Sequence, residues 1–212
     1  MDVVVAGGHG KVGLRLLRRL AERGDRARGL IRNPHHAADL EASGAEPVLS
    51  DLEQEDDLAP HVEGADAIVF AAGAGPGSGP ARKQTMDLGG AVKLIDAARA
   101  VGIARYVIVS SMGAGNPERA SGPMRPYLEA KTQADGRLAA SGLDYTIVRP
   151  GGLTDEPGSG RIRAGLELSF GQVSRDDVAA TLVAVLDADN TIGKTFDLLA
   201  GDTPIEEAVR AL

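Results

Sequence analysis

The fold of this chain is decided by residues 2–20, DVVVAGGHGKVGLRLLRRL. A short apolar run passes through a turn with glycines at positions 7, 10 and 13 into an amphipathic segment, which predicts a strand, a tight turn and a helix. This G-x-x-G-x-x-G spacing leaves room for backbone to approach a pyrophosphate, and the amides that open a helix attract phosphates. We interpret the turn as a dinucleotide-binding site, with an ordinary structural turn as the alternative. His9 within it is interpreted as incidental to catalysis.

The same alternation of apolar runs and helix-length segments continues along the chain. We expect strands at residues 2–6, 26–31, 46–49, 66–70, 104–110, 144–149 and 194–199. We expect helices at residues 11–23, 35–43, 53–60, 82–101, 126–141, 174–187 and 204–211. Such alternation is typical of parallel βαβ units, and continuously apolar strands indicate a sheet covered on both faces. The sequence therefore predicts an α/β fold, a doubly wound parallel sheet of the Rossmann type with a small C-terminal substrate-binding portion.

The length of 212 residues fits a single domain, residues 1–212, in which residues 151–172 and 188–212 form a small cap on the substrate side. Two glycine-rich loops, at residues 74–80 and 154–160, follow the fourth and sixth predicted strands. Loops that leave the carboxyl ends of parallel strands line the ligand crevice. Both are candidates for substrate loops, with plain flexible linkers as the alternative.

Composition excludes several classes of function. The net charge is −7 and the 23 Lys and Arg residues are spread along the chain, so we expect no nucleic-acid partner. The absence of cysteine excludes disulfides and thiolate chemistry, and the four histidines show no metal-ligand spacing, so we expect no metal. No apolar run approaches the roughly 20 residues of a membrane span. We expect a cytoplasmic protein with no membrane partner, either a monomer or a homodimer.

The end of the second predicted strand bears on the choice of cofactor. An NAD site usually carries an acidic residue there, for the adenosine ribose hydroxyls. This chain has Arg32-Asn33-Pro34 instead, and we expect no nearby carboxylate to repel a ribose 2′-phosphate from Arg32. The prediction is NADP rather than NAD, with a solvated strand-end arginine as the alternative.

Tyr127 and Lys131 are four residues apart and therefore share one face of a predicted helix. Hydride transfer to a carbonyl leaves an alkoxide that needs a proton donor, and a neighbouring ammonium favours the phenolate form of a tyrosine. Tyr127 is the candidate acid/base and Lys131 the group that tunes it. Ser111, chosen over Ser110, ends the fifth strand and is the candidate for orienting the substrate; the alternative is a turn serine.

These motifs, together with Thr146-Ile147-Val148-Arg149-Pro150-Gly151, resemble the short-chain dehydrogenase/reductase superfamily, in particular its atypical NAD(P)-binding branch of the NAD-dependent epimerase/dehydratase type. The resemblance covers nearly the whole chain. It implies that Asp51 and Leu52 contact adenine and that Lys131 bonds the nicotinamide ribose. The residues expected to bind the cofactor are Gly7, His9, Gly10, Lys11, Val12, Gly13, Arg32, Asn33, Asp51, Leu52, Ala71, Ala72, Gly73, Lys131, Pro150, Gly151, Gly152 and Leu153.

The leading functional hypothesis is an NADP-dependent oxidoreductase acting on a small carbonyl or quinone-like molecule, with Ser111, Tyr127 and Lys131 as its catalytic residues. Two alternatives stay open at this point. One is a redox sensor or regulator that binds NADP without turnover, and the other is a nucleotide-sugar epimerase or dehydratase. Two features depart from the family pattern: Ala71-Ala72 stand where relatives often carry Asn, and the cap is much shorter than that of the larger epimerases.

Overall fold

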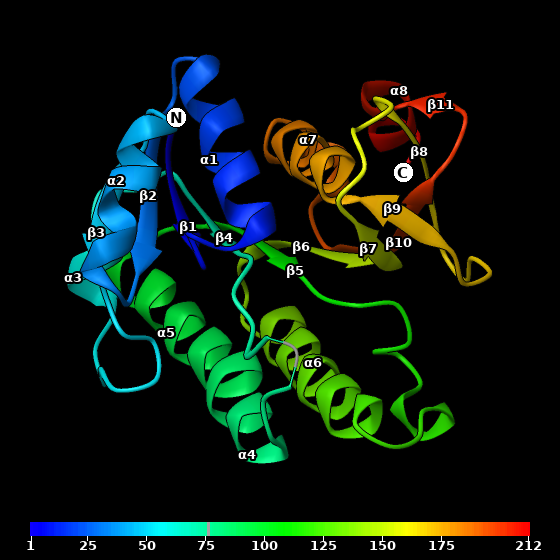
Figure 1. Ribbon diagram of the computed structural model, residues 1–212, viewed down its shortest axis with the longest axis horizontal. Helices are drawn as coiled ribbons and strands as arrows, with labels where there is room; N and C mark the ends of the chain where they lie inside the picture. The colour runs from blue at the N-terminus through cyan, green and yellow to red at the C-terminus, as the bar shows by residue number, and fades with distance from the viewer. Residues whose placement is uncertain (76) are drawn as a thin grey trace.

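The computed structural model describes residues 1–75 and 77–212, and its centre is a mostly parallel sheet (Figure 1). Seven strands run parallel in the order β3-β2-β1-β4-β5-β6-β10. Their bounds are β1 (Asp2–Ala6), β2 (Arg26–Ile31), β3 (Glu46–Leu49), β4 (Ala67–Phe70), β5 (Arg105–Val109), β6 (Asp144–Pro150) and β10 (Lys194–Ala200). The predicted doubly wound α/β fold is confirmed.

Four further strands, which the sequence pattern did not predict, belong to the C-terminal third. β8 (Arg161–Gly165) and β11 (Thr203–Pro204) extend the sheet beyond β10 in antiparallel fashion. β7 (Gly152–Thr154) and β9 (Gln172–Ser174) pair parallel to each other in a separate ribbon. Each of the four is short, so its sequence has too few positions for an alternating apolar pattern to distinguish a strand from a turn or loop. The predicted cap segment 151–172 thus supplies short strands, whereas segment 188–212 supplies β10, β11 and α8.

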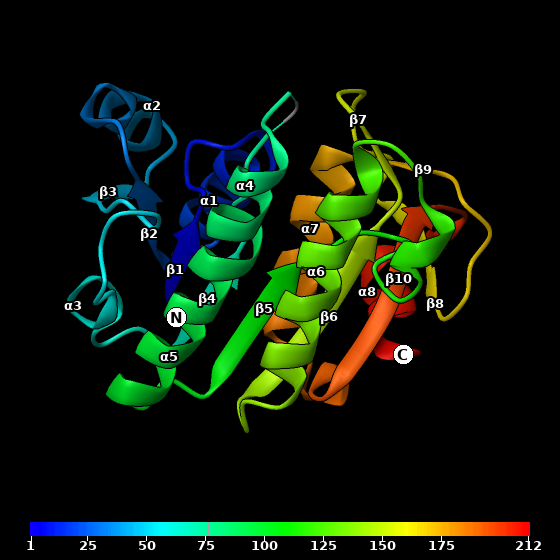
Figure 2. The ribbon, with the colours of Figure 1, turned by 90° about the horizontal axis from the view of Figure 1, so that it is seen from below.

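Helices cover both faces of the sheet (Figures 1 and 2). On one face lie α1 (Lys11–Glu22), α2 (Ala37–Ala42), α7 (Arg175–Leu186) and α8 (Ile205–Arg210). On the other lie α3 (Ala59–Val62), α5 (Ala91–Val101) and α6 (Met124–Ala139). Short 3₁₀ turns are η1 (Pro34–His36), η3 (Pro117–Arg119) and η4 (Asp189–Thr191). Among the described helices, none has the length and apolar character to cross a bilayer.

The two-sided core explains why β1 is apolar at successive positions. Successive side chains of a strand point to opposite faces. Val3 and Val5 enter the core under α1 and α7, whereas Val4 and Ala6 enter the core under α5 and α6. Since both faces are buried, every position of the strand requires an apolar residue.

The helix predicted at residues 53–60 is wrong. The chain instead makes turns after β3, and helix α3 begins only at Ala59. Side chains hold these turns: Asp51 Oδ1 accepts a hydrogen bond from the Glu53 amide at 2.9 Å, and Asp57 Oδ1 accepts one from the Ala59 amide at 2.9 Å. Aspartate side chains that bond the backbone two residues on favour turns over helix.

The long helix predicted at residues 82–101 has three parts. A single turn, α4 (Pro80–Arg82), leads into a π-helical stretch, η2 (Lys83–Gly90), which continues as α5. π-helical stretches are rare and are often found at functional sites. This one begins at the end of the loop that follows β4, on the side of the sheet where the parallel strands end (Figure 2).

Candidate active site

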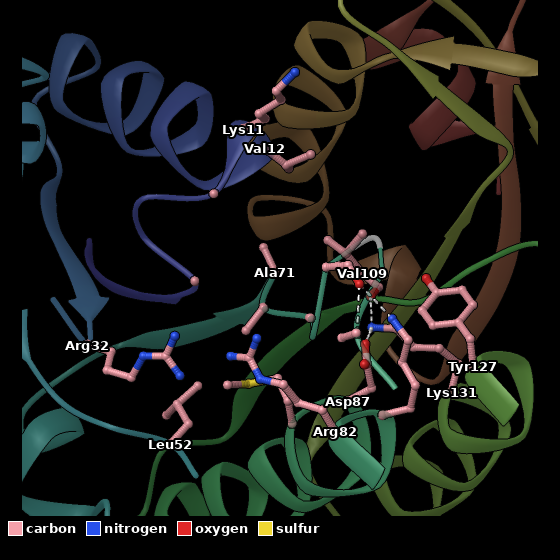
Figure 3. A pocket seen from close by; sticks show the side chains of 18 of the residues that line it. Lys11, Val12, Arg32, Leu52, Ala71, Arg82, Asp87, Val109, Tyr127 and Lys131 are labelled. Carbon is pink, nitrogen blue, oxygen red and sulfur yellow. Dashed lines mark hydrogen bonds and ion pairs between the residues drawn. The ribbon is translucent and has the colours of Figure 1, made fainter. Parts of the chain in front are cut away.

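A cleft of about 1440 Å³ lies at the carboxyl edge of the parallel strands (Figure 3). The loops after β1, β2, β3 and β4 line one end of it, and η2, the end of β5 and the start of α6 line the other. β1 lies between β2 and β4, the point where the strand order reverses. In open α/β sheets this switch point is where ligands bind. The glycine-rich 74–80 loop contributes Gly75, Gly77, Ser78, Gly79 and Pro80; its residue 76 lies outside the described residues.

The glycine turn is packed so closely that side chains do not fit. Gly7 has a φ of +80°, and a Cβ there would lie 2.8 Å from the Cα of Ala72. A Cβ on Gly13 would lie 2.2 Å from the carbonyl oxygen of Gly7, and one on Gly8 would lie 2.9 Å from the Cα of Gly29. In the described chain no side chain caps the start of α1, so its first amides remain available to a ligand. This geometry fits a dinucleotide pyrophosphate.

At the end of the cleft where the resemblance places adenosine, here called the adenosine end, Arg32, Asn33, Asp51 and Leu52 all line the cleft. The expectation that no carboxylate lies near Arg32 is wrong, because Glu53 Oε2 lies 3.2 Å from Arg32 Nη1. Burial works to raise the pKa of Glu53, but hydrogen bonds from Thr85 and Arg82 and the charges of both arginines outweigh it and lower that pKa. Sequence reasoning missed Glu53 because the residue falls where a helix was expected.

At the opposite end, Tyr127 and Lys131 project from α6 into the cleft (Figure 3). The Lys131 ammonium lies 5.9 Å from the centre of the Tyr127 ring and donates a hydrogen bond to the carbonyl oxygen of Val109 at 3.1 Å. It also lies 3.5 Å from Oδ1 of Asp87, a fully buried residue of η2 that lines the cleft. Asp87 Oδ2 accepts a hydrogen bond from the Ala74 amide at 3.2 Å. Asp87 carries no local signal in the sequence, because only the fold brings η2 beside α6.

The two serines at the end of β5 differ in position. Ser110 lines the cleft, and its hydroxyl donates to Asp135 Oδ2 at 2.9 Å. Ser111 lies outside the described lining and donates to the carbonyl oxygen of Met112 at 3.3 Å. Arg149 also donates to Asp135, with Nε at 3.0 Å. Burial raises the pKa of Asp135, against the lowering effects of Arg149 and Ser110.

The remaining predicted residues fall into two groups. Those that line the cleft are Gly7, His9, Gly10, Lys11, Val12, Ala71, Ala72, Gly73 and Leu153. Gly13, Pro150, Gly151 and Gly152 lie outside the described lining. Gly13 packs directly behind the turn, and Gly152 donates its amide to Gly171 at 2.9 Å, which joins the two segments of the β7–β9 ribbon. Cleft residues that sequence reasoning did not select include Arg82, Lys83, Met86 and Arg175.

Beside the glycine turn, Asp155 forms ion pairs with cations from two helices. Lys11 Nζ lies 2.5 Å and Arg175 Nη1 lies 3.0 Å from its carboxylate, and Arg15 approaches it at 3.9 Å. The hydrogen bond from Lys11 is the main cause that lowers the pKa of Asp155. The loop after β7, one of the two candidate substrate loops, is thereby tied to the start of α1.

Together, the fold and the cleft define a dinucleotide-binding α/β protein. Residues 7–189 match the NAD(P)H-binding family model, and the chain belongs to this family, an atypical branch of the short-chain dehydrogenase/reductase type. It is 45% identical over 214 residues to YhfK of Bacillus subtilis, by name an uncharacterized sugar epimerase, with 100% of both chains covered.

Solved structures agree with this assignment. A Bacillus halodurans protein, assigned by name to the NAD-dependent epimerases/dehydratases, is 40% identical with a TM-score of 0.95 over 100% of both chains. ChuY of Escherichia coli O157:H7, named an anaerobillin reductase, is 27% identical with a TM-score of 0.82 over 95% of this chain and 98% of its own. The family thus includes NAD(P)-dependent reductases, and NAD(P)H binding is the property common to the group.

Proposed function

We propose that this protein is an NADP-dependent oxidoreductase that moves a hydride between the nicotinamide and a small carbonyl or quinone-like substrate. The observation that carries the proposal is that Tyr127 and Lys131 line the same cleft as the glycine turn. One end of the cleft is suited to phosphates and the other offers a proton donor. The cofactor, when bound, supplies the hydride; all remaining roles belong to the protein.

The glycine turn and the open start of α1 hold the pyrophosphate through backbone amides. Arg32 lines the cleft directly after β2, where this fold class binds the adenosine ribose, and this position supports NADP over NAD. Lys131, fixed by Val109 and Asp87, is placed for the nicotinamide ribose and for Tyr127. The start of α1, which no side chain caps in the described chain and which opens on the cleft at Gly10, Lys11 and Val12, fits the pyrophosphate of such a cofactor.

Tyr127 is the proton donor in the direction of reduction. A carbonyl that accepts a hydride gains negative charge on oxygen, and the phenol of Tyr127 delivers a proton to that oxygen. The ammonium of Lys131 stabilises the phenolate left behind. Lys83 adds a second ammonium 5.2 Å from the Tyr127 ring centre. Both cations therefore stabilise the negative charge that develops at this end of the cleft.

The lining around Tyr127 supports a substrate with an apolar body. Pro123, Met124 and Pro126 stand just before Tyr127 in the chain and line the cleft with it, and the Met124 side chain is partly open to solvent. Apolar walls with few polar groups are typical of pockets for small organic molecules. A conjugated carbonyl or quinone matches such walls and the proton donor Tyr127.

The test is NADPH oxidation with a panel of aldehydes, ketones and quinones, comparing the wild type with Tyr127→Phe. We expect turnover of at least one compound, its loss in Tyr127→Phe, and unchanged NADPH affinity. Tyr145→Phe is a matched control, because Tyr145 packs beside a core cluster instead of lining the cleft. Tight NADP binding without turnover of any compound would favour a redox sensor.

The names of the two most similar proteins described above favour a second candidate, a nucleotide-sugar epimerase or dehydratase. Such an enzyme uses its cofactor transiently and returns it to the starting redox state. Consumption of a sugar nucleotide with no net change in NADPH would support this activity over reduction.

A further inference from the structure

We propose that Arg32 and Arg82 together form the binding site for the 2′-phosphate of NADP, and that Glu53 holds the two guanidinium groups in position. The inference rests on the proposed function and identifies two further residues, Arg82 and Glu53, that determine the choice between NADP and NAD. Arg32 follows β2, whereas Arg82 ends α4, on the other side of the adenosine end of the cleft.

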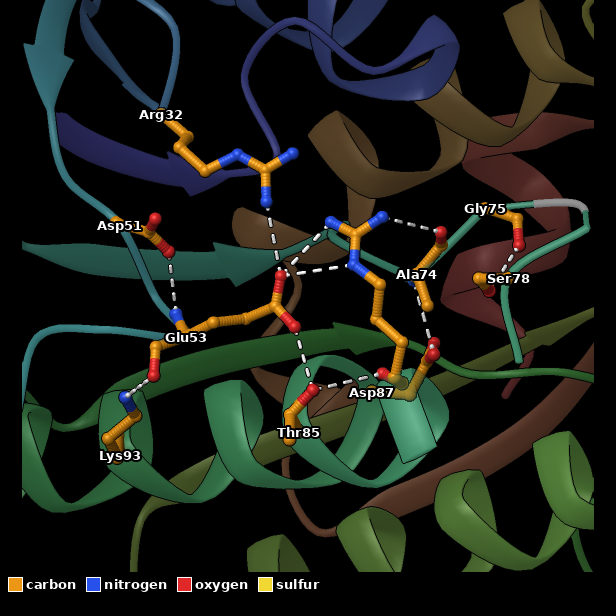
Figure 4. Close-up of polar contacts among 10 residues, drawn as sticks. Arg32, Asp51, Glu53, Ala74, Gly75, Ser78, Thr85, Asp87 and Lys93 are labelled. Atoms are coloured by element: carbon orange, nitrogen blue, oxygen red, sulfur yellow. Dashed lines mark hydrogen bonds and ion pairs between the residues drawn. The ribbon is translucent and has the colours of Figure 1, made fainter. Parts of the chain in front are cut away.

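The two arginines meet on one oxygen atom. Arg32 Nη1 donates to Glu53 Oε2 at 3.2 Å, and Arg82 donates to the same oxygen from Nε at 3.1 Å and from Nη2 at 3.0 Å. Figure 3 shows the two guanidinium groups pointing toward each other across the cleft. Figure 4 shows Glu53 beneath Arg32, with Thr85 on its other carboxylate oxygen at 2.7 Å.

Burial separates the roles of the three side chains. The Glu53 side chain is only 12% exposed, whereas Arg32 is 55% and Arg82 is 38% exposed. The carboxylate thus forms the floor of the cluster, and the guanidinium groups face the cleft. A carboxylate held from several sides costs little further ordering when a ligand arrives, so the arginines are preorganised for an anion.

The charge of the cluster suits a phosphate and not a hydroxyl. Two guanidinium groups and one carboxylate leave one net positive charge. Each guanidinium carries five N–H donors in a fixed fork. Arg32 uses one donor on Glu53, and Arg82 uses two there and one on the carbonyl oxygen of Ala74 at 3.3 Å. The remaining N–H groups can donate hydrogen bonds to the oxygens of a phosphate, for which arginine is well suited.

The position of the cluster assigns it to the adenosine ribose. In this fold class the group that follows the second strand contacts the ribose 2′ position. Asp51 and Leu52, which the resemblance assigns to adenine, come directly before Glu53 in the same turn. The alternative role is a brace that ties α4 to the turn after β3 and has no preference between cofactors. A brace would affect the binding of every adenine nucleotide equally.

The experiment compares the wild type with Arg82→Gln by titration calorimetry, using NADPH, NADH, 2′,5′-ADP and 5′-AMP. We expect Arg82→Gln to weaken the binding of NADPH and of 2′,5′-ADP by about tenfold or more, since one charge-assisted contact is lost. The affinities for NADH and 5′-AMP should change by less than about twofold. Arg137→Gln is the matched control, because Arg137 is an exposed arginine of α6 outside the described lining.

Equal weakening of all four nucleotides in Arg82→Gln would overturn the inference in favour of the brace. Unchanged binding of all four would overturn it as well. A wild type that binds none of them would instead refute the proposed function, so the two failures are distinguishable. Should Arg82→Gln unfold, Arg82→Lys keeps the positive charge but loses the fork, and a selective loss of 2′,5′-ADP affinity is expected. An equal loss for 5′-AMP in that variant would again indicate a brace.

Discussion

The Nζ atom of Lys131 lies 3.5 Å from Oδ1 of Asp87, and the two side chains are 4% and 0% exposed. An ion pair so deeply buried makes each partner dependent on the other. Removal of one charge leaves its partner uncompensated away from water, at a cost of about 3 to 5 kcal/mol. We therefore expect Asp87→Ala to lower the free energy of unfolding by about that amount, measured by denaturant titration.

The same pair provides its own control. Asp87→Asn keeps an oxygen for the Ala74 amide, so it should lose less stability than Asp87→Ala. The double variant Asp87→Ala/Lys131→Met removes both charges and should recover part of the loss. Additive losses in the double variant would contradict a direct coupling between the two side chains.

Ser110 and Ser111 can be distinguished by single substitutions. Ser110 faces the cleft while its proton is engaged by Asp135, which leaves its oxygen to accept a hydrogen bond from a substrate or phenol hydroxyl. We expect Ser110→Ala to lower kcat by about tenfold and Ser111→Ala by less than about twofold. Steady-state kinetics of both variants, with NADPH affinity measured beside them, test this. The opposite ranking would return the role to Ser111.

The glycine turn should tolerate no added methyl group. Gly13→Ala would place a Cβ 2.2 Å from the Gly7 carbonyl oxygen, so the turn must shift. We expect a loss of about 1 to 3 kcal/mol in stability and strongly weakened NADPH binding. Gly136→Ala is the matched control. Gly136 lies in α6, where an added Cβ would meet no described atom within 4 Å beyond its own stretch of helix, and alanine there should stabilise the protein by about 0.5 to 1 kcal/mol.

Glu53 should contribute to the acid sensitivity of the fold. Its pKa in the folded protein is below the ordinary value of 4.5, so its stabilisation is fully present above that pH and is lost as the pH falls through the folded-state pKa. Glu53→Gln lacks this contribution. Plots of Tm against pH for the two proteins should run at a constant offset above about pH 5 and converge below it. Parallel curves down to the lowest pH would contradict the lowered pKa.

Local sequence patterns predicted those parts of the site whose residues lie close together in the sequence. The glycine turn, Arg32, and the Tyr127 and Lys131 pair each follow from the spacing within one strand, turn or helix. Contacts between separate elements did not follow: Glu53 joins Arg32 across 21 residues and Arg82 across 29 residues. Asp87 likewise meets Lys131 only because η2 packs beside α6. Periodicity carries no information about which side chains of different elements meet.

The π-helical stretch η2 determines how changes in chain length would act on the cleft. Arg82 immediately precedes it and Asp87 lies within it, so one segment sets the positions of groups at both ends of the cleft. A π turn holds one more residue than an α turn, so deleting one of the eight residues of η2 would change the rotation and the rise between Arg82 and α5. Either Arg82 would swing away from Glu53 or Asp87 would turn away from Lys131. Insertions and deletions in η2 are therefore expected to disturb the cleft, since the extra residue of the π turn keeps Arg82 and Asp87 beside their partners at the same time.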